Sequence, residues 1–232
     1  MIPLHDDVPR TTWPWVTVTL ILANCAVFYR EVSLEPFQLN ALIESYAIVP
    51  ARTVAFFSGL PVSPQRALLP FFTAMFLHGG WLHLIGNMWF LWIFGDNVED
   101  RVGHMRFVIF YLACGLAASA VYVFLSPEST VPSVGASGAI AGVMGAYLIT
   151  FPGARVKTLI PIFIFPARVE IRAYIILVYW FLLQFLSGVA SIQSTAAESQ
   201  GGGVAWFAHV GGFAAGIPLM LLLRPSRRKR TA

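Results

Sequence analysis

VGASGAIAGVMGAYLITF, residues 134–151, is an apolar, glycine-rich segment without a charged residue, and Ser137 stands near its start. A second apolar segment, VAWFAHVGGFAAGIPLMLLL, covers residues 204–223 and carries one histidine, His209. Ionisable residues inside membrane spans are costly, so each is a functional hypothesis by default. Ser137 and His209 are therefore candidates for a nucleophile and its base, built below a membrane surface.

The composition of the whole chain indicates an integral membrane protein. Of its 232 residues, 57% are hydrophobic and only 11% are charged, whereas a soluble domain carries about 25% charged residues. Several apolar runs reach the roughly 20 residues that a helix needs to cross a bilayer. We expect an all-α polytopic membrane protein, a bundle of six transmembrane helices with no separate soluble domain.

Turn signals and charges separate the six predicted spans. The first is expected to be a span rather than a signal peptide, because it ends in Arg30-Glu31 and not in a small-residue cleavage site. A short cytoplasmic N-terminus, 1–12, precedes the membrane domain, 13–223, and a basic cytoplasmic tail, 224–232, follows it. The spans cover residues 13–31, 73–95, 105–125, 134–151, 172–190 and 204–223.

The basic residues predict which side of the membrane each connection faces. With the N-terminus inside, only Arg30, Arg52 and Arg66 of the 15 Lys and Arg residues fall in outer segments. Both termini are therefore predicted to be cytoplasmic. The basic run 227–230 is explained by a stop-transfer anchor better than by nucleic-acid binding, so no nucleic-acid partner is expected.

The connection over residues 32–72 is the longest outer segment and is unusually apolar. It is too hydrophobic for a solvated loop and too interrupted by proline for a span, so we expect a partly embedded, interfacial loop. Cys25 and Cys114 lie in different spans, which argues against a structural disulfide.

The predicted topology places Ser137 and His209 at similar depth, because both lie near the outer start of spans that run from outside to inside. Glycines four residues apart occur in both spans, and small residues at that spacing let helix backbones approach closely. One interpretation is that these glycines only pack the two helices together. The sharper interpretation is that their packing brings a nucleophile to its base. They are Gly138 and Gly142 in one span, and Gly212 and Gly216 in the other.

The span over residues 73–95 adds two polar side chains at the same outer depth. His83 and Asn87 are four residues apart and so share one helix face. Both can donate hydrogen bonds, and hydrolysis of an amide needs donors for the oxyanion that forms. His78 is five positions before His83 and would face elsewhere on a continuous helix, so we interpret it as a structural loop anchor.

Three separated motifs resemble those of the rhomboid intramembrane serine proteases, in the minimal six-span prokaryotic form. They are His83-x-x-x-Asn87, Gly135-x-Ser137-Gly138 and Ala208-His209-x-x-Gly212. The resemblance covers nearly the whole chain and implies a Ser137–His209 dyad without an aspartate. It also implies an oxyanion hole formed by His83, Asn87 and the backbone N–H of Ser137, with no cofactor and no metal.

The resemblance further implies that the span over residues 172–190 and the polar segment 190–203 move to admit substrate. Trp180 and Phe181 are plausible gate residues, although packing or lipid contact is the simpler interpretation of each, and Gln184 is interpreted as an interhelical hydrogen-bonding residue. The chain departs from some bacterial members at Leu69-Pro70 and at Ala141, where those members carry Trp-Arg and an aromatic residue that stacks on the base. These departures bear on substrate preference and remove no catalytic group.

The expected function is therefore intramembrane endoproteolysis of other transmembrane proteins, in the lipid bilayer of a prokaryotic cytoplasmic membrane. An inactive rhomboid-like binding or quality-control protein is the main alternative, but such relatives normally lose the serine or the base. A transporter would carry more charged residues facing the bundle core. A zinc metalloprotease would need an H-E-x-x-H motif, which the sequence lacks. The natural substrate and the oligomeric state are not written in the sequence.

Overall fold

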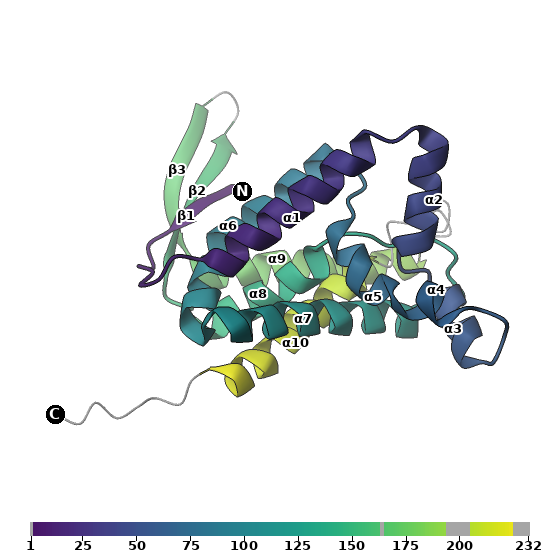
Figure 1. Cartoon of the computed structure of the whole chain (residues 1–232). Coiled ribbons are helices and arrows are strands. Elements are labelled where there is room, and N and C mark those ends of the chain that lie inside the picture. Colours follow the sequence, from purple (N-terminus) through teal and green to yellow (C-terminus); the bar gives the residue numbers. More distant parts are fainter. Residues whose placement is uncertain (1, 163–164, 194–204, 225–232) are drawn as a thin grey trace.

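The computed structural model describes residues 2–162, 165–193 and 205–224. Each of the six expected spans contains a helix, and these helices pack into one bundle (Figure 1). A small sheet lies at one end of the bundle, and four short helices lie at the other. The six helices are α1 (Trp15–Val32), α6 (Trp81–Val102), α7 (His104–Leu125), α8 (Ser137–Thr150), α9 (Ala173–Gln193) and α10 (Ala205–Leu223).

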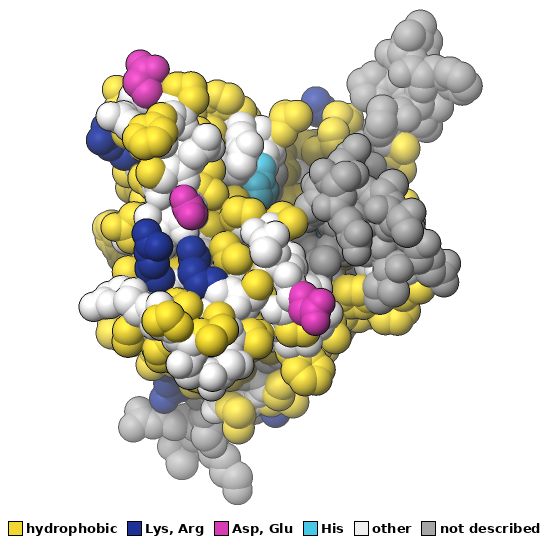
Figure 2. Space-filling view, turned by 90° about the vertical axis from the view of Figure 1, so that its right-hand side faces the viewer, with side chains coloured by type: hydrophobic (Ala, Val, Ile, Leu, Met, Phe, Trp, Pro, Cys, Tyr) yellow, Lys and Arg dark blue, Asp and Glu magenta, His cyan; other side chains and the backbone are white. Residues whose placement is uncertain are grey.

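The apolar helices and surface identify a multi-pass membrane protein. Within the described ranges α1, α7 and α10 are long and apolar enough to cross a membrane, and the bent pair Pro64–Phe76 and Trp81–Val102 makes a fourth candidate. Helices α8 and α9 are apolar but shorter, so a crossing by all six remains a prediction. Hydrophobic side chains dominate the face in Figure 2, where charged groups are few.

The expectation of an all-α fold is wrong at the sheet end. Strands β1 (Ile2–Asp6), β2 (Arg155–Ile162) and β3 (Phe165–Arg172) form an antiparallel sheet in the order β1-β2-β3. In β2 the side chains of Val156 and Thr158 are buried while Lys157 between them is exposed, the alternation of a half-buried strand. The predicted spans end at residue 151 and resume at residue 172, and the strands between them form by pairing with each other and with the N-terminal β1.

The N-terminal segment is fastened to the sheet end of α6 rather than left as a free tail. The buried carboxylate of Glu99 accepts hydrogen bonds from the backbone N–H groups of Val16 and Thr17, at 2.9 and 2.7 Å, and from the Thr17 hydroxyl. Asp100 accepts further bonds from Thr11 and Thr12. The bonds to Glu99 satisfy free N–H groups in the first turn of α1, where negative charge is favourable.

The outer connection is helical rather than an irregular loop. Its four helices each start at a proline, which is well suited to the first helical position because its N–H is missing and its φ is fixed. Proline was expected to break this segment, but here it begins each helix. They are α2 (Pro36–Tyr46), α3 (Pro50–Phe57), α4 (Pro64–Leu68) and α5 (Pro70–Thr73), followed by the 3₁₀ turn η1 (Ala74–Phe76).

The span expected at 73–95 is divided in the structure. Helix α6 begins only at Trp81, and the chain bends by 75° between Phe76 and Trp81. Gly80 sits at this break with φ +156°. The break places His78 before the helix and not on it, which matters for the site described below.

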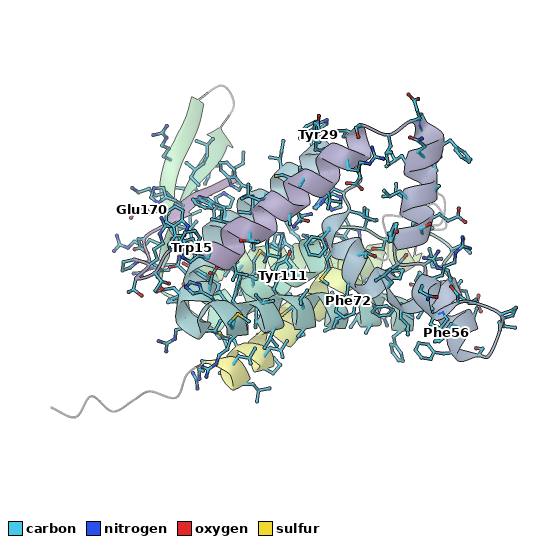
Figure 3. All side chains as sticks on the ribbon, in the orientation of Figure 1. Trp15, Tyr29, Phe56, Phe72, Tyr111 and Glu170 are labelled. Atoms are coloured by element: carbon cyan, nitrogen blue, oxygen red, sulfur yellow. The ribbon has the colours of Figure 1, made fainter. Side chains whose placement is uncertain are left out.

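Helix α8 is the centre of the bundle. Every residue from Ala139 to Tyr147 is buried, against α6, α7 and α10. A helix that is apolar all round is well suited to such a position. Tyr111 of α7 is buried in the same interior, whereas Tyr29 and Trp15 of α1 are exposed (Figure 3).

Candidate active site

Ser137 is the first residue of α8, and the segment before it is fixed by contacts with other elements. Ser133 exchanges backbone hydrogen bonds with Ile48, at 2.8 and 3.0 Å, and the Gly135 N–H donates to the Ala74 carbonyl at 2.8 Å. Gly135 has φ +128°, which strongly favours glycine. The turn therefore delivers the Ser137 hydroxyl to the N-terminal end of a buried helix, where backbone N–H groups lack helical partners.

His209 of α10 lies against Ser137. Its Nε2 is 2.7 Å from Ser137 Oγ, a hydrogen bond that joins residues of two different helices. The glycines of α8 and α10 make the approach feasible: a Cβ at Gly212 would collide with the carbonyl oxygen of Gly138, and one at Gly216 with that of Gly142.

The other ring nitrogen of His209 also has a partner. Its Nδ1 is 2.6 Å from Oε1 of Gln184, a buried residue of α9. The rings of Trp180 and Trp206 lie 6.0 and 6.3 Å from the His209 ring, centroid to centroid. Ala141, four residues after Ser137, has no aromatic ring. The aromatic rings beside His209 come instead from Trp180 of α9 and Trp206 of α10.

The sequence did not predict that Gln184 contacts the site. A polar residue within an apolar span was a visible signal, and its interpretation as an interhelical hydrogen-bonding residue was compatible with the contact. The sequence did not reveal that its partner is His209, because nothing in spacing fixes the rotation of α9 against α10. Trp180 and Phe181 both pack on Phe213 of α10, so the structure places them in helix packing.

His83 is oriented so that one ring nitrogen faces the serine. The Gly79 N–H donates to His83 Nδ1 at 3.3 Å, which leaves Nε2 to carry the proton of a neutral ring. A Cβ at Gly135 would lie 2.7 Å from this Nε2 and 3.6 Å from Ser137 Oγ. The His83 Nε2–H is therefore a donor directed at the space beside Ser137.

His78 does not face away from His83 as expected. The two imidazole rings are 5.1 Å apart, edge to face, because His78 lies in the break before α6 and the helical rotation used for the prediction does not apply. The His78 backbone N–H donates to the buried carboxylate of Glu31 on α1, at 3.2 Å to each oxygen. Neither ring nitrogen of His78 has a partner among the described residues.

Asn87 lies one helical turn beyond His83 and is buried. Its Nδ2 has no hydrogen-bond partner in the described part of the chain, so this donor is available. The side chain is not among those that line the cavity at Ser137. The structure therefore brings Ser137, His209 and His83 together at one cavity, which Asn87 does not line.

A cavity of about 120 Å³ opens at these residues. Residues of the outer connection and of α7 form its other walls, among them Ile48, Ala74, Ser119 and Tyr122. The Tyr122 hydroxyl donates to the Val131 carbonyl at 2.9 Å, which helps to hold the wall formed by the segment before α8. The site is thus a small pocket lined by Ser137, His83 and His209, by two further serines, Ser119 and Ser133, and otherwise mainly by apolar residues.

In a comparison with known protein families, residues 65–226 match the rhomboid domain. The chain belongs to the rhomboid family. It is 32% identical over 145 residues to presenilin-associated rhomboid-like protein A, mitochondrial, of Danio rerio, covering 60% of this chain and 38% of that protein. RHOMBOID-like protein 6, mitochondrial, of Arabidopsis thaliana is 32% identical over 163 residues, covering 60% and 52%.

A bacterial rhomboid also matches, over a shorter stretch. The rhomboid protease GluP of Bacillus subtilis is 45% identical over 76 residues, which is 33% of this chain and 14% of that protein. The chain spans from about a seventh to about half of the length of these three relatives. Membership of the family therefore rests on the rhomboid domain. The family includes serine proteases.

Proposed function

We propose that this rhomboid-family chain is an intramembrane serine endopeptidase that hydrolyses peptide bonds in or near the transmembrane helices of other proteins. The observation that supports this function best is the 2.7 Å contact between Ser137 Oγ and His209 Nε2, at the N-terminal end of the buried helix α8. A serine is a weak nucleophile unless a base within hydrogen-bond reach takes its proton, and this geometry provides such a base.

In the proposed reaction, His209 Nε2 accepts the proton of Ser137 while Oγ attacks the carbonyl carbon of the substrate. The His83 Nε2–H, the Asn87 amide and the Ser137 backbone N–H stabilise the oxyanion. His209 then gives its proton to the leaving amine, and water hydrolyses the acyl-enzyme with His209 acting as base again. Donors fixed before the charge develops, in a poorly hydrated site, are especially effective.

The proposed substrates are transmembrane proteins, because the site is embedded in a bundle with an apolar surface. Under the predicted orientation the cavity opens toward the outer face, where the short helices α2–α5 lie. Residence in a prokaryotic cytoplasmic membrane is part of the proposal.

The test is cleavage of a single-span substrate by protein reconstituted in liposomes. Ser137→Ala and His209→Ala are each expected to abolish cleavage and labelling by a serine-reactive fluorophosphonate. Ser119→Ala is the matched control, since Ser119 lines the same cavity but has no role in the proposed reaction, and it should retain both activities. Unchanged cleavage by Ser137→Ala would exclude a serine protease. Substrate that cross-links to folded wild-type protein but is never cut would favour the inactive binding protein.

A further inference from the structure

Both ring nitrogens of His209 are engaged by side chains from two other helices. Ser137 on α8 contacts Nε2 at 2.7 Å, and Gln184 on α9 contacts Nδ1 through its carboxamide oxygen at 2.6 Å. Gln184 is only 8% exposed. Helices α8 and α10 contain no acidic residue, so the usual carboxylate partner of a catalytic histidine is not available from them.

The atom that Gln184 presents determines which nitrogen of the neutral imidazole holds the proton. A carboxamide oxygen can only accept, so Nδ1 must donate to it and Nε2 is left with a free lone pair. That is the tautomer in which Nε2 can accept the Ser137 proton. A reversed amide would present an N–H to Nδ1 and favour the opposite, unproductive tautomer. Loss of the amide, as in Gln184→Leu below, should therefore slow the reaction if the oxygen faces Nδ1 and should not slow it if the N–H does.

The packing of α9 on α10 holds Gln184 against the histidine. Trp180, one turn earlier, lies 6.0 Å from the His209 ring, centroid to centroid. A Cβ at Gly188, one turn later, would lie 3.0 Å from the Phe207 ring of α10. Residues at three successive turns of one α9 face therefore meet α10, and Gln184 is the polar one among them.

We propose that Gln184 is a positioning residue whose carboxamide oxygen fixes the tautomer and ring orientation of His209. The inference rests on the proposed Ser137–His209 mechanism, in which it supplies the part that an aspartate plays in a three-residue serine protease site. A neutral amide is less costly than a carboxylate to bury within a membrane bundle, which is a physical reason for glutamine at this position.

The first test is Gln184→Leu, which keeps the approximate size of the side chain but removes the acceptor. We expect kcat to fall roughly ten- to a hundredfold, comparable with the loss of an outer hydrogen-bond partner from a metal-bound histidine. KM for the single-span substrate should stay within a factor of about two, since Gln184 touches the base and not the substrate. Leu183→Met, on the exposed side of α9, is the control and should match wild type in both constants.

Gln184→Glu provides the rescue, because it retains an acceptor oxygen at the same distance along the side chain. It should recover most of the kcat and fluorophosphonate labelling rate lost in Gln184→Leu. A Glu variant that is folded but as slow as the Leu variant would overturn the proposal, since an acceptor oxygen at this position would then not restore activity. Wild-type kcat in a folded Gln184→Leu would overturn it too.

A third measurement uses the wild-type protein and so does not depend on any variant folding. Nitrogen NMR of ¹⁵N-histidine protein, above the ordinary histidine pKa of about 6.5, should show His209 as the Nδ1–H tautomer, assigned by comparison with His209→Ala. An Nε2–H tautomer would refute the role of Gln184. These outcomes are distinct from failure of the proposed function, in which Ser137→Ala would still cleave substrate.

Discussion

At the scale of single residues, the two proposed oxyanion donors differ in their placement. His83 lines the cavity with its Nε2 beside Gly135, two residues before Ser137, and its Nδ1 is fixed by the Gly79 N–H. Asn87 is buried with an unpaired Nδ2 but does not line the cavity. A donor that is already fixed needs no reorganisation when charge develops, so His83 is the better placed of the two.

Removal of either donor should slow turnover without removing the nucleophile. We expect His83→Ala and Asn87→Ala each to lower kcat by a factor on the order of 100, the typical loss for one oxyanion donor. Single-turnover cleavage in liposomes measures this, with thermal unfolding in detergent as the control for folding. If Asn87→Ala only lowered the unfolding temperature and left kcat intact, Asn87 would be a structural residue.

A second prediction at this scale concerns Asp6 at the sheet end. Burial raises the pKa of its carboxyl above the ordinary range, although the Tyr147 hydroxyl and the Asn97 amide both donate to it. A raised pKa in the folded state means that the folded protein binds the proton more tightly than the unfolded chain. This contribution to stability is complete below the ordinary pKa of about 3.9 and is lost as pH rises through the folded value.

Asp6→Asn should remove that loss, because asparagine carries no ionisable carboxyl. The unfolding temperature of the variant relative to wild type is therefore expected to increase as pH rises from about 4 toward neutrality. Melting curves in detergent at several pH values measure the difference. A difference that stays constant with pH would show that Asp6 titrates normally.

At the scale of elements, the crossing of α8 and α10 determines where the serine and histidine meet. Gly212 and Gly216 of α10 face the carbonyl oxygens of Gly138 and Gly142, so backbone contacts backbone along two helical turns. Van der Waals packing of small residues is a main source of association between membrane helices. The same contact supports stability and the 2.7 Å hydrogen bond between Ser137 and His209.

A methyl group at this crossing should therefore reduce both stability and activity. Gly212→Ala would collide with the Gly138 carbonyl and separate the helices, and a misplacement of about 1 Å can cost on the order of a hundredfold in rate. Gly86→Ala in α6 is the matched control, since its Cβ would meet no atom within 4 Å. Equal effects of the two substitutions on kcat and unfolding temperature would contradict this account.

At the scale of the whole molecule, the sheet and the short helices α2–α5 mark opposite ends of the bundle (Figure 1). The basic residues predict that the sheet is cytoplasmic and that α2–α5 are outside. Ile48 and Ala74, from the α2–α5 end, line the cavity at Ser137. The orientation of the molecule therefore decides from which side the site is reached.

Cysteine labelling in cells tests this orientation. With Cys25 and Cys114 replaced by alanine, Gln65→Cys in α4 should react with a membrane-impermeant maleimide in intact cells. Lys157→Cys in β2 should react only after the membrane is permeabilised, since both side chains are exposed in the structure and differ only in side. The reverse pattern would place the cavity on the cytoplasmic face.

The sequence by itself determined the membrane class, the helical character of six segments and the residues that we propose carry the chemistry. Composition and apolar length reflect the bilayer, and a serine or histidine in an apolar span is conspicuous wherever the span packs. The sequence also showed the paired glycines of the two spans that carry Ser137 and His209, because a four-residue spacing is a local property of one helix.

Only the tertiary structure decided the partners of those residues. The pairing of β1 with β2, across about 150 residues, fastens the N-terminus, and the 75° bend before α6 turns His78 toward His83. The contact of Gln184 with His209 depends on how α9 is rotated against α10. Rotation and distant pairing arise from packing among elements far apart in the chain, and no local spacing encodes them.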